Sequence, residues 1–237
     1  MSSKNTNYFT KENLDMYLKE VAKEFRKLNG KYVYAEIILI GGASIVINYD
    51  FRNATNDVDA LIQTTASIKE AINHIGDKFN LPNYWLNSDF SQTSSYSSKL
   101  REVSKHYKTF ANIVEYRTID AEYLIAMKLM AGRKYKNDLS DIVGILKSHK
   151  DNGNLITLKM IEEAVEKLYG SWDILSLESR EFIEEITHEK NYEEIFEKIR
   201  MEEQTNQEAI IDFDQKYPKI LKESNLTDIL NLLKQKK

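Results

Sequence analysis

Residues 38–63 read ILIGGASIVINYDFRNATNDVDALIQ, and this stretch decides the fold. The β-branched and aromatic run over 32–40 predicts a strand that leads directly into Gly41-Gly42. We expect a short helix over 43–49, then a loop, then a second strand over 57–63. The second strand carries two acids inside an apolar run, where a charge needs a physical reason.

The two acids are Asp57 and Asp59. Alternate residues of a strand point to the same side, so we expect both carboxylates on one face. Carboxylates held this close repel each other unless a cation neutralises them. Mg²⁺ prefers carboxylate and phosphate oxygens, and two such ions can hold an in-line phosphoryl displacement. The pattern therefore favours nucleotidyl transfer, and the alternative is a solvated strand edge or turn.

Gly41 and Gly42 are placed to bind an anion. Backbone N–H groups at a helix start bind phosphate well when no side chain obstructs them. Ser44 adds a hydroxyl to the same turn, although no Gly-Lys-Ser/Thr follows, so this is not a Walker loop. The alternative for an isolated Gly-Gly is a tight strand-to-helix turn.

Composition limits the class of protein. The 237 residues are 42% hydrophobic and 30% charged, and only 8 glycines and 2 prolines favour long regular elements. The absence of cysteine excludes disulfides and thiolate metal sites and fits a reducing cytoplasm. The polar start predicts no secretory signal, and no stretch reaches the ~20 apolar residues of a membrane helix.

The charge is unevenly distributed. Residues 151–237 carry 12 Lys and Arg against 20 Asp and Glu, a net charge of −8. Residues 1–150 carry a net charge of +4, and they include the aspartate pair. A mildly basic region is compatible with a polyanionic substrate.

The remaining segments are mainly helical in pattern. We expect a polar loop over 87–98 and a strand over 108–119. Predicted helices cover 10–28, 65–79, 121–132, 138–149, 157–170, 177–188, 192–217 and 227–235. The fold class is therefore α+β, with a small mixed β-sheet core flanked by helices and a C-terminal helical region. We expect a first domain over 1–150 and a helical region over 151–237.

The order strand, Gly-Gly, short helix, loop and Asp-x-Asp strand resembles the opening of the polymerase-β-type nucleotidyltransferase superfamily. A closer likeness is to minimal bacterial nucleotidyltransferases, including the AbiEii-like toxins of abortive-infection systems and an uncharacterised related group. In that group Gly-Gly precedes Arg-x-x-Thr-x-Asp-hydrophobic-Asp, which RNATNDVDA matches through Arg52, Thr55, Asp57 and Asp59. The resemblance implies an NTP substrate, with Mg²⁺ or Mn²⁺ held by the two aspartates.

A second segment, AEYLIAMKLMAGRKYKNDLSDIVGIL over 121–146, resembles later motifs of the same group. The resemblance implies that Lys128 contacts nucleotide phosphates and that Asp138 or Asp141 completes the site. The alternatives are a lysine whose stem covers apolar surface and acids that suit a helix N-terminus. A third metal-binding carboxylate is usual on a later strand of the superfamily, and Glu115 is the candidate by position.

The leading hypothesis is a Mg²⁺-dependent nucleotidyltransferase whose acceptor is an RNA or tRNA end, a protein hydroxyl or a small molecule. The resemblance makes a toxin or phage-defence role plausible, with an antitoxin as partner. The rival hypothesis is a catalytically decayed nucleotide-binding or protein-interaction module on the same fold. Basic residues over 99–108, together with those over 133–136, are a candidate rim for RNA phosphates, with an ordinary solvated face as the alternative.

Overall fold

The computed structural model describes residues 8–63, 66–222 and 225–235. The chain divides into two compact units. Residues 1–124 and 167–169 form the first, and residues 125–166 and 170–237 form the second. The domain boundary expected at 150/151 stays a prediction. The division into units falls within a helix, because residues past 124 make contacts with later helices. For example, the Leu129 carbonyl accepts a hydrogen bond from the Ser179 hydroxyl.

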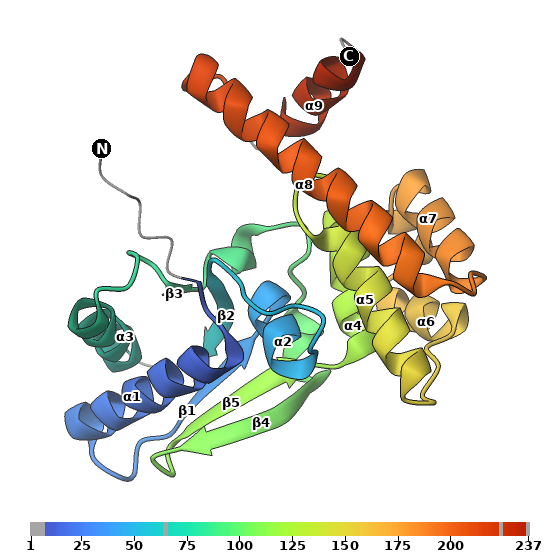
Figure 1. The fold of residues 1–237 in the computed structure, drawn as a ribbon. Helices are drawn as coiled ribbons and strands as arrows, with labels where there is room; N and C mark the ends of the chain where they lie inside the picture. Colours follow the sequence, from blue (N-terminus) through green and yellow to red (C-terminus); the bar gives the residue numbers. More distant parts are fainter. Residues whose placement is uncertain (1–7, 64–65, 223–224, 236–237) are drawn as a thin grey trace. The chain divides into compact units, whose positions relative to one another are not determined.

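The first unit is a five-stranded mixed sheet with helices, which confirms the expected α+β class (Figure 1). Its strand order is β3-β2-β1-β5-β4. The strands β1 and β2 are antiparallel, whereas β1 and β5 are parallel. Its elements, including two short 3₁₀ turns, are α1 (Lys11–Asn29), β1 (Ala35–Leu39), α2 (Gly41–Asn48), β2 (Val58–Gln63), α3 (Ala66–Phe79), β3 (Leu86–Asn87), η1 (Asp89–Gln92), η2 (Ser98–Arg101), β4 (Ser104–Phe110) and β5 (Val114–Ile119).

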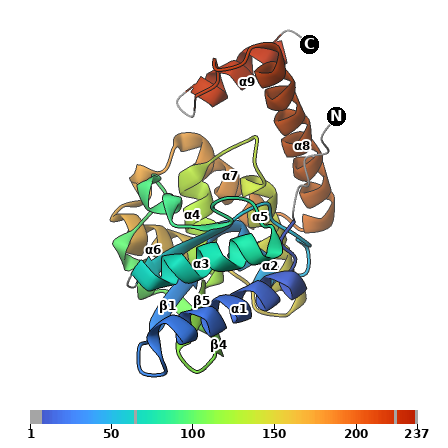
Figure 2. The same ribbon diagram turned by 90° about the vertical axis from the view of Figure 1, so that its left-hand side faces the viewer.

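Helix α1 begins and ends where the sequence indicates. Thr10 and Asn13 form a reciprocal capping box at its start, and Gly30 ends it with a positive φ. Its apolar face packs beside α3 on one face of the sheet (Figure 2). Thr65, the first residue of the helix expected over 65–79, lies outside the described residues.

One face of the sheet packs against α1 and α3, and the candidate site residue Asp59 is on the opposite face. On β1, Ile37 and Leu39 face the core beneath α1 and α3, as Val58 and Ala60 do on β2. Asp59 lies between the last two in sequence, so its side chain points to the opposite face. The side chains that do not enter the core under α1 and α3 are therefore the ones available for a site.

The strand expected over 108–119 is wrong in its extent, because the chain folds back inside it. Residues Ala111 and Asn112 both have positive φ and form the tight turn of a β4–β5 hairpin. The sequence lacks a glycine at this turn, and β4 itself is rich in polar residues, so neither gave a strand signal.

The second unit is helical in its described residues. It includes the end of α4 (Ala121–Ala131), then α5 (Asp138–Asp151), most of α6 (Leu158–Tyr169), η3 (Trp172–Ile174), α7 (Leu177–Thr187), α8 (Tyr192–Lys216) and α9 (Leu226–Gln235). These bounds confirm the expected helices to within two residues. Within the described part of the chain, no helix has the length and apolar character needed to cross a membrane.

Candidate functional site

The turn between β1 and α2 needs both of its glycines, for different reasons. Gly41 has a φ of +53°, which side-chain-bearing residues rarely adopt. Gly42 needs space instead, because a Cβ there would lie 2.5 Å from the Thr55 hydroxyl oxygen and 2.9 Å from a guanidinium nitrogen of Arg52. We call Gly41, Gly42 and the side chains against them the glycine corner.

The first turn of α2 opens at this corner. Its N-cap is Ile40, which supplies no side-chain hydrogen bond to the N–H groups of the first turn. The Ser44 amide donates the first hydrogen bond of the helix, to the Ile40 carbonyl. The amides before Ser44 therefore have no acceptor within the helix. Because Gly41 and Gly42 have no side chains, an anion can approach these N–H groups closely.

Ser44 itself points inward. Its side chain is fully buried, and its hydroxyl accepts a hydrogen bond from the Ile119 amide at 3.2 Å. Asn48 also donates to this hydroxyl, at 3.3 Å. The hydroxyl therefore ties α2 to the end of β5.

The carboxylates of Asp57 and Asp59 lie at the glycine corner. An Asp59 oxygen is 3.7 Å from the place where a Gly41 Cβ would stand. An Asp57 oxygen is 3.5 Å from the Thr55 hydroxyl, which itself contacts Gly42. Asp57 is exposed and Asp59 is half-buried. The structure thus brings together the acids and the glycines that the sequence singled out.

Arg52 and Thr55 line the same corner. Thr55 is buried and is fixed by two backbone hydrogen bonds to Phe9. Arg52 donates from Nε to the Ala54 carbonyl and holds a terminal nitrogen 3.5 Å from the Thr55 hydroxyl. The Arg-x-x-Thr-x-Asp spacing therefore places a guanidinium and a hydroxyl next to the carboxylates.

Glu115 is not brought to the two aspartates. It is level with Glu36 on β1, which is level with Gln63 at the far end of β2. Gln63 is four residues beyond Asp59, or about 13 Å along the strand. Glu115 instead forms an ion pair with Arg117 at 2.5 Å. Its distance from Asp59 is too great for a shared ion.

The register also shows what stands at the level of Asp59. The Ile40 amide, directly after β1, donates to the Asp59 carbonyl, and continuing the β1–β5 register brings apolar Ile119 level with Ile40. On the other side, Asn87 of β3 pairs with Asp59. Sequence reasoning missed Asn87 because a two-residue strand in a polar segment has no periodicity. Among the described residues, no cluster of three or more His, Asp or Glu side chains is arranged to hold a metal ion.

Lys128 and Asp138 belong to a buried ionic cluster in the second unit. The Lys128 ammonium lies 2.7 Å from Asp138 and 2.8 Å from Asp141, and the three side chains are 9%, 1% and 3% exposed. The half-buried Arg133 side chain also donates a hydrogen bond to Asp138. Burial by itself would raise the pKa of Asp138, but Lys128 and Arg133 outweigh it and lower that pKa to about 2.

Glu203 of α8 closes the start of α5 beside this cluster. Its carboxylate accepts hydrogen bonds from the Leu139 and Ser140 amides and from the Ser140 hydroxyl. Burial raises the pKa of Glu203 to about 7 in spite of these bonds. A carboxylate 64 residues away thus replaces the missing N-terminal cap of α5 and attaches α8 to it.

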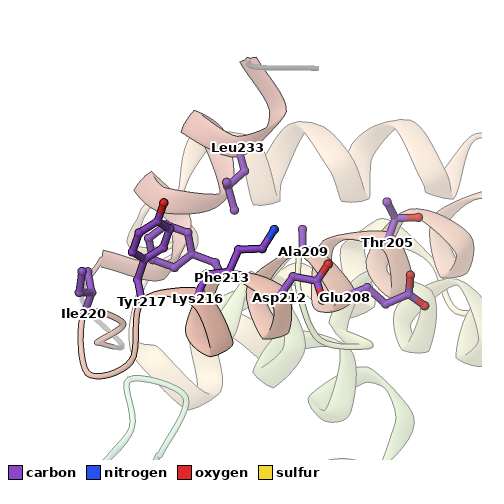
Figure 3. A pocket seen from close by; sticks show the side chains of 9 residues that line it. All are labelled: Thr205, Glu208, Ala209, Asp212, Phe213, Lys216, Tyr217, Ile220 and Leu233. Carbon is purple, nitrogen blue, oxygen red and sulfur yellow. The ribbon is translucent and has the colours of Figure 1, made fainter.

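A hollow of about 680 Å³ lies between α8 and α9 in the second unit. Figure 3 shows Phe213, Tyr217 and Leu233 along it. Glu208 and Asp212 also line it. Lys216 lies beside them, so two carboxylates and one ammonium stand among the apolar side chains.

Comparison with known proteins gives one family match. Residues 16–224 match the model of a family described as "Nucleotidyltransferase of unknown function (DUF6036)". No curated protein and no solved structure gives a significant match.

Proposed function

The chain belongs to this nucleotidyltransferase family, and we propose that the glycine corner transfers a nucleoside monophosphate from an NTP to an acceptor hydroxyl. The observation that carries the proposal is the meeting of Asp57 and Asp59 with the uncapped first turn of α2. Amide donors for phosphate and carboxylate ligands for a cation are the two requirements of such a reaction, and both stand at one corner.

The triphosphate would bind at the amides of Gly41, Gly42 and the next residue. Backbone N–H groups at a helix start stabilise phosphate through hydrogen bonds and the helix dipole. Arg52 adds a positive charge at the same place, and Thr55 adds a hydroxyl. The buried Ser44 hydroxyl would support this turn from the sheet side.

The oxygens of Asp57 and Asp59 suit Mg²⁺ or Mn²⁺, which take carboxylate, water and phosphate ligands together. Such an ion would neutralise phosphate charge and reduce the repulsion between the two acids. The acceptor oxygen would bond to the α-phosphorus while the bond to the bridging oxygen breaks and pyrophosphate leaves. The hydroxyl proton would pass to water. Catalysis here rests on positioning and charge neutralisation.

The roles in nucleotide binding that the resemblance implies for Lys128 and Asp138 stay predictions. Both side chains are buried in mutual ion pairs, so binding phosphate would require the Lys128 ammonium to leave two carboxylates. The proposal does not depend on them.

The acceptor and the biological role extend the proposal further. We infer an RNA or tRNA end, or a protein hydroxyl, as acceptor, because the resemblance is to AbiEii-like toxins and their relatives. The same resemblance supports a toxin or phage-defence role with an antitoxin partner. Because NTPs are intracellular and the chain has no cysteine, we place the reaction in the cytoplasm.

One observation favours a second candidate, a module that binds a nucleotide without transferring it. The superfamily usually has a third carboxylate, whereas the positions level with Asp59 are Asn87 and, by continued register, Ile119. A site with two acids holds a cation less firmly and neutralises less charge. Tight NTP binding with no transfer to any acceptor would favour this candidate.

The experiment is incubation with each α-labelled NTP, Mg²⁺ or Mn²⁺, total tRNA and cell lysate, followed by a search for labelled product. Asp57→Asn combined with Asp59→Asn is expected to reduce transfer to background while the circular dichroism spectrum is unchanged. A control replaces Glu70 by Gln and Asp77 by Asn, two exposed acids of α3, and should retain transfer. Transfer by the Asp57/Asp59 variant at the parent rate would refute the proposal.

A further inference from the structure

A basic hollow of about 510 Å³ lies between α1 and the β4–β5 turn. Its lining includes the four cations Lys19, Lys23, Arg26 and Lys27, and no acid. The lysines lie four residues apart on one face of α1, so their positions repeat about every 6 Å along the helix. This spacing is close to the separation of successive phosphates along a nucleic-acid strand.

The cations of the basic hollow remain accessible. Lys23 and Lys27 pair with acids three residues earlier on α1, yet their side chains are 52% and 73% exposed. Such surface pairs contribute little and yield readily to a phosphate. Arg26 donates from one terminal nitrogen to the Ala111 carbonyl, which orients its guanidinium at the β4–β5 turn.

The basic residues over 99–108 differ from this group. Arg101 pairs with Glu36, Lys105 with Asp120, and Lys108 with Asp15, so each is bonded to an acid from another element. Lys105 and Lys108 are also less exposed than Lys23 and Lys27, so α1 offers the more accessible phosphate contact. The lining of the basic hollow has the excess of positive charge.

Aromatic side chains surround the same turn. Phe110 lines the basic hollow, and a neighbouring hollow of about 490 Å³ shares Thr109 with it. The second hollow is lined by Tyr34, which is 70% exposed, and by Glu36 and Glu115. These two acids are paired with Arg101 and Arg117, so their charges are compensated. Phe110 is partly buried against the core, so Tyr34 is the exposed ring. An exposed ring beside a row of cations suits single-stranded nucleic acid, because a base stacks on the ring while cations contact the backbone. Membrane surfaces and acidic peptides require the cations alone.

The neighbouring hollow also connects this surface to the catalytic face. Gln63 lines it and lies at the opposite end of β2 from Asp59, on the same side of the sheet. The two positions are about 13 Å apart along the strand. A strand held on α1 and passing the turn therefore reaches the sheet face that carries Asp59.

We propose that the basic hollow and the Tyr34 ring beside the β4–β5 turn bind the backbone and bases of a single-stranded RNA acceptor. This inference rests on the proposed function, because it names the substrate class that accepts the nucleotide. The bound RNA places its terminal hydroxyl toward the aspartates, and the surface contributes affinity without taking part in the chemistry.

The test measures RNA binding separately from transfer. Fluorescein-labelled oligouridylate and total tRNA are titrated at several salt concentrations with the full chain carrying Asp57→Asn and Asp59→Asn, which prevents turnover. In this background Lys19, Lys23 and Lys27 are all replaced by Gln, a good helix former. We expect at least a tenfold weaker Kd and a salt slope smaller by about 2, at roughly 0.7 per lost contact.

Two further variants separate charge from stacking. Tyr34→Ala is expected to weaken binding about tenfold at every salt concentration with an unchanged slope, since stacking involves no counterion release. The matched control replaces Lys159, Lys190 and Lys198 of the second unit by Gln, removes the same charge, and should keep the parent Kd and slope.

Several outcomes would overturn the inference. They are an unchanged Kd in the α1 triple variant, an equal loss in the control, or tighter binding to phosphatidylserine vesicles or polyglutamate than to RNA. Failure of this inference can be distinguished from failure of the proposed function. RNA binding without transfer by the chain with both aspartates would refute the transfer, whereas transfer without RNA binding would refute only the RNA surface.

Discussion

Two aspartate pairs of this protein look alike in sequence and differ in environment. At the glycine corner Asp57 is exposed and Asp59 is half-buried, whereas Asp138 and Asp141 are both buried and paired with Lys128. An acid pair matched inside the protein stabilises packing, because breaking it leaves an uncompensated buried charge. We propose instead that the pair beside the helix-start amides binds a cation and a polyphosphate.

The largest expected effect concerns the buried pair. Lys128→Met leaves the carboxylates of Asp138 and Asp141 without their shared ammonium, and we expect a loss of about 3–5 kcal/mol in unfolding free energy. Urea unfolding followed by circular dichroism measures it. Lys159→Met is the control, since its side chain is 82% exposed and should change stability by less than about 0.5 kcal/mol.

The same variant tests the role that the family resemblance implies. A Lys128→Met protein that is as stable as the parent but no longer binds NTP would show that the lysine serves phosphate binding. A destabilised protein that still binds NTP below its unfolding transition would show that the lysine serves packing.

A smaller effect is expected at the glycine corner. In Gly42→Ala the new Cβ would displace Thr55 and Arg52, with a cost of about 1–3 kcal/mol in stability and a clear loss of NTP affinity. Gly30→Ala is the control, because its φ is +75° but nothing lies within 4 Å. It should lose about 1–3 kcal/mol of stability from backbone strain and retain NTP binding. Equal NTP affinity in both variants would contradict the close packing at the corner.

The smallest expected effect is a pH dependence in the second unit. The folded pKa of Glu203 is raised to about 7, so the folded state holds a proton that the unfolded chain has released. The unfolding free energy of the second unit should therefore fall as the pH rises, by about 1–2 kcal/mol between pH 6 and 8. Glu203→Gln removes this dependence and is the comparison. Parallel stability profiles for the two proteins would contradict the raised pKa.

Much of the fold could be predicted because local signals agreed with the packing. Helix α1 has a capping box at Thr10 and a terminal Gly30, and both act as the sequence indicates. The β4–β5 hairpin could not be predicted, because its turn uses Ala111 and Asn112 with positive φ and has no glycine. No turn or loop residue marks the division inside α4, so the sequence could not indicate it, and the boundary expected at 150/151 stays a prediction.

The site was predictable where neighbours in sequence are neighbours in space. Residues 41–59 form one short path, so the glycines, Arg52, Thr55 and the aspartates meet as expected. Register between distant strands cannot be read from one sequence, and for this reason Glu115 was placed wrongly relative to Asp59 and Asn87 was missed. Burial of Lys128 and the cap from Glu203 also depend on contacts between separate helices.

The most direct test of the central claim is a titration of Mn²⁺ binding in the presence of each NTP. The electron paramagnetic resonance signal of free Mn²⁺ measures the binding. Our account predicts that one Mn²⁺–NTP binds well to the parent and at least about tenfold more weakly to the Asp57→Asn, Asp59→Asn variant, because the carboxylates supply the cation ligands. The α3 control, which combines Glu70→Gln with Asp77→Asn, should bind as the parent does. Parent-like binding of Mn²⁺–NTP by the variant that lacks both site carboxylates would contradict the account.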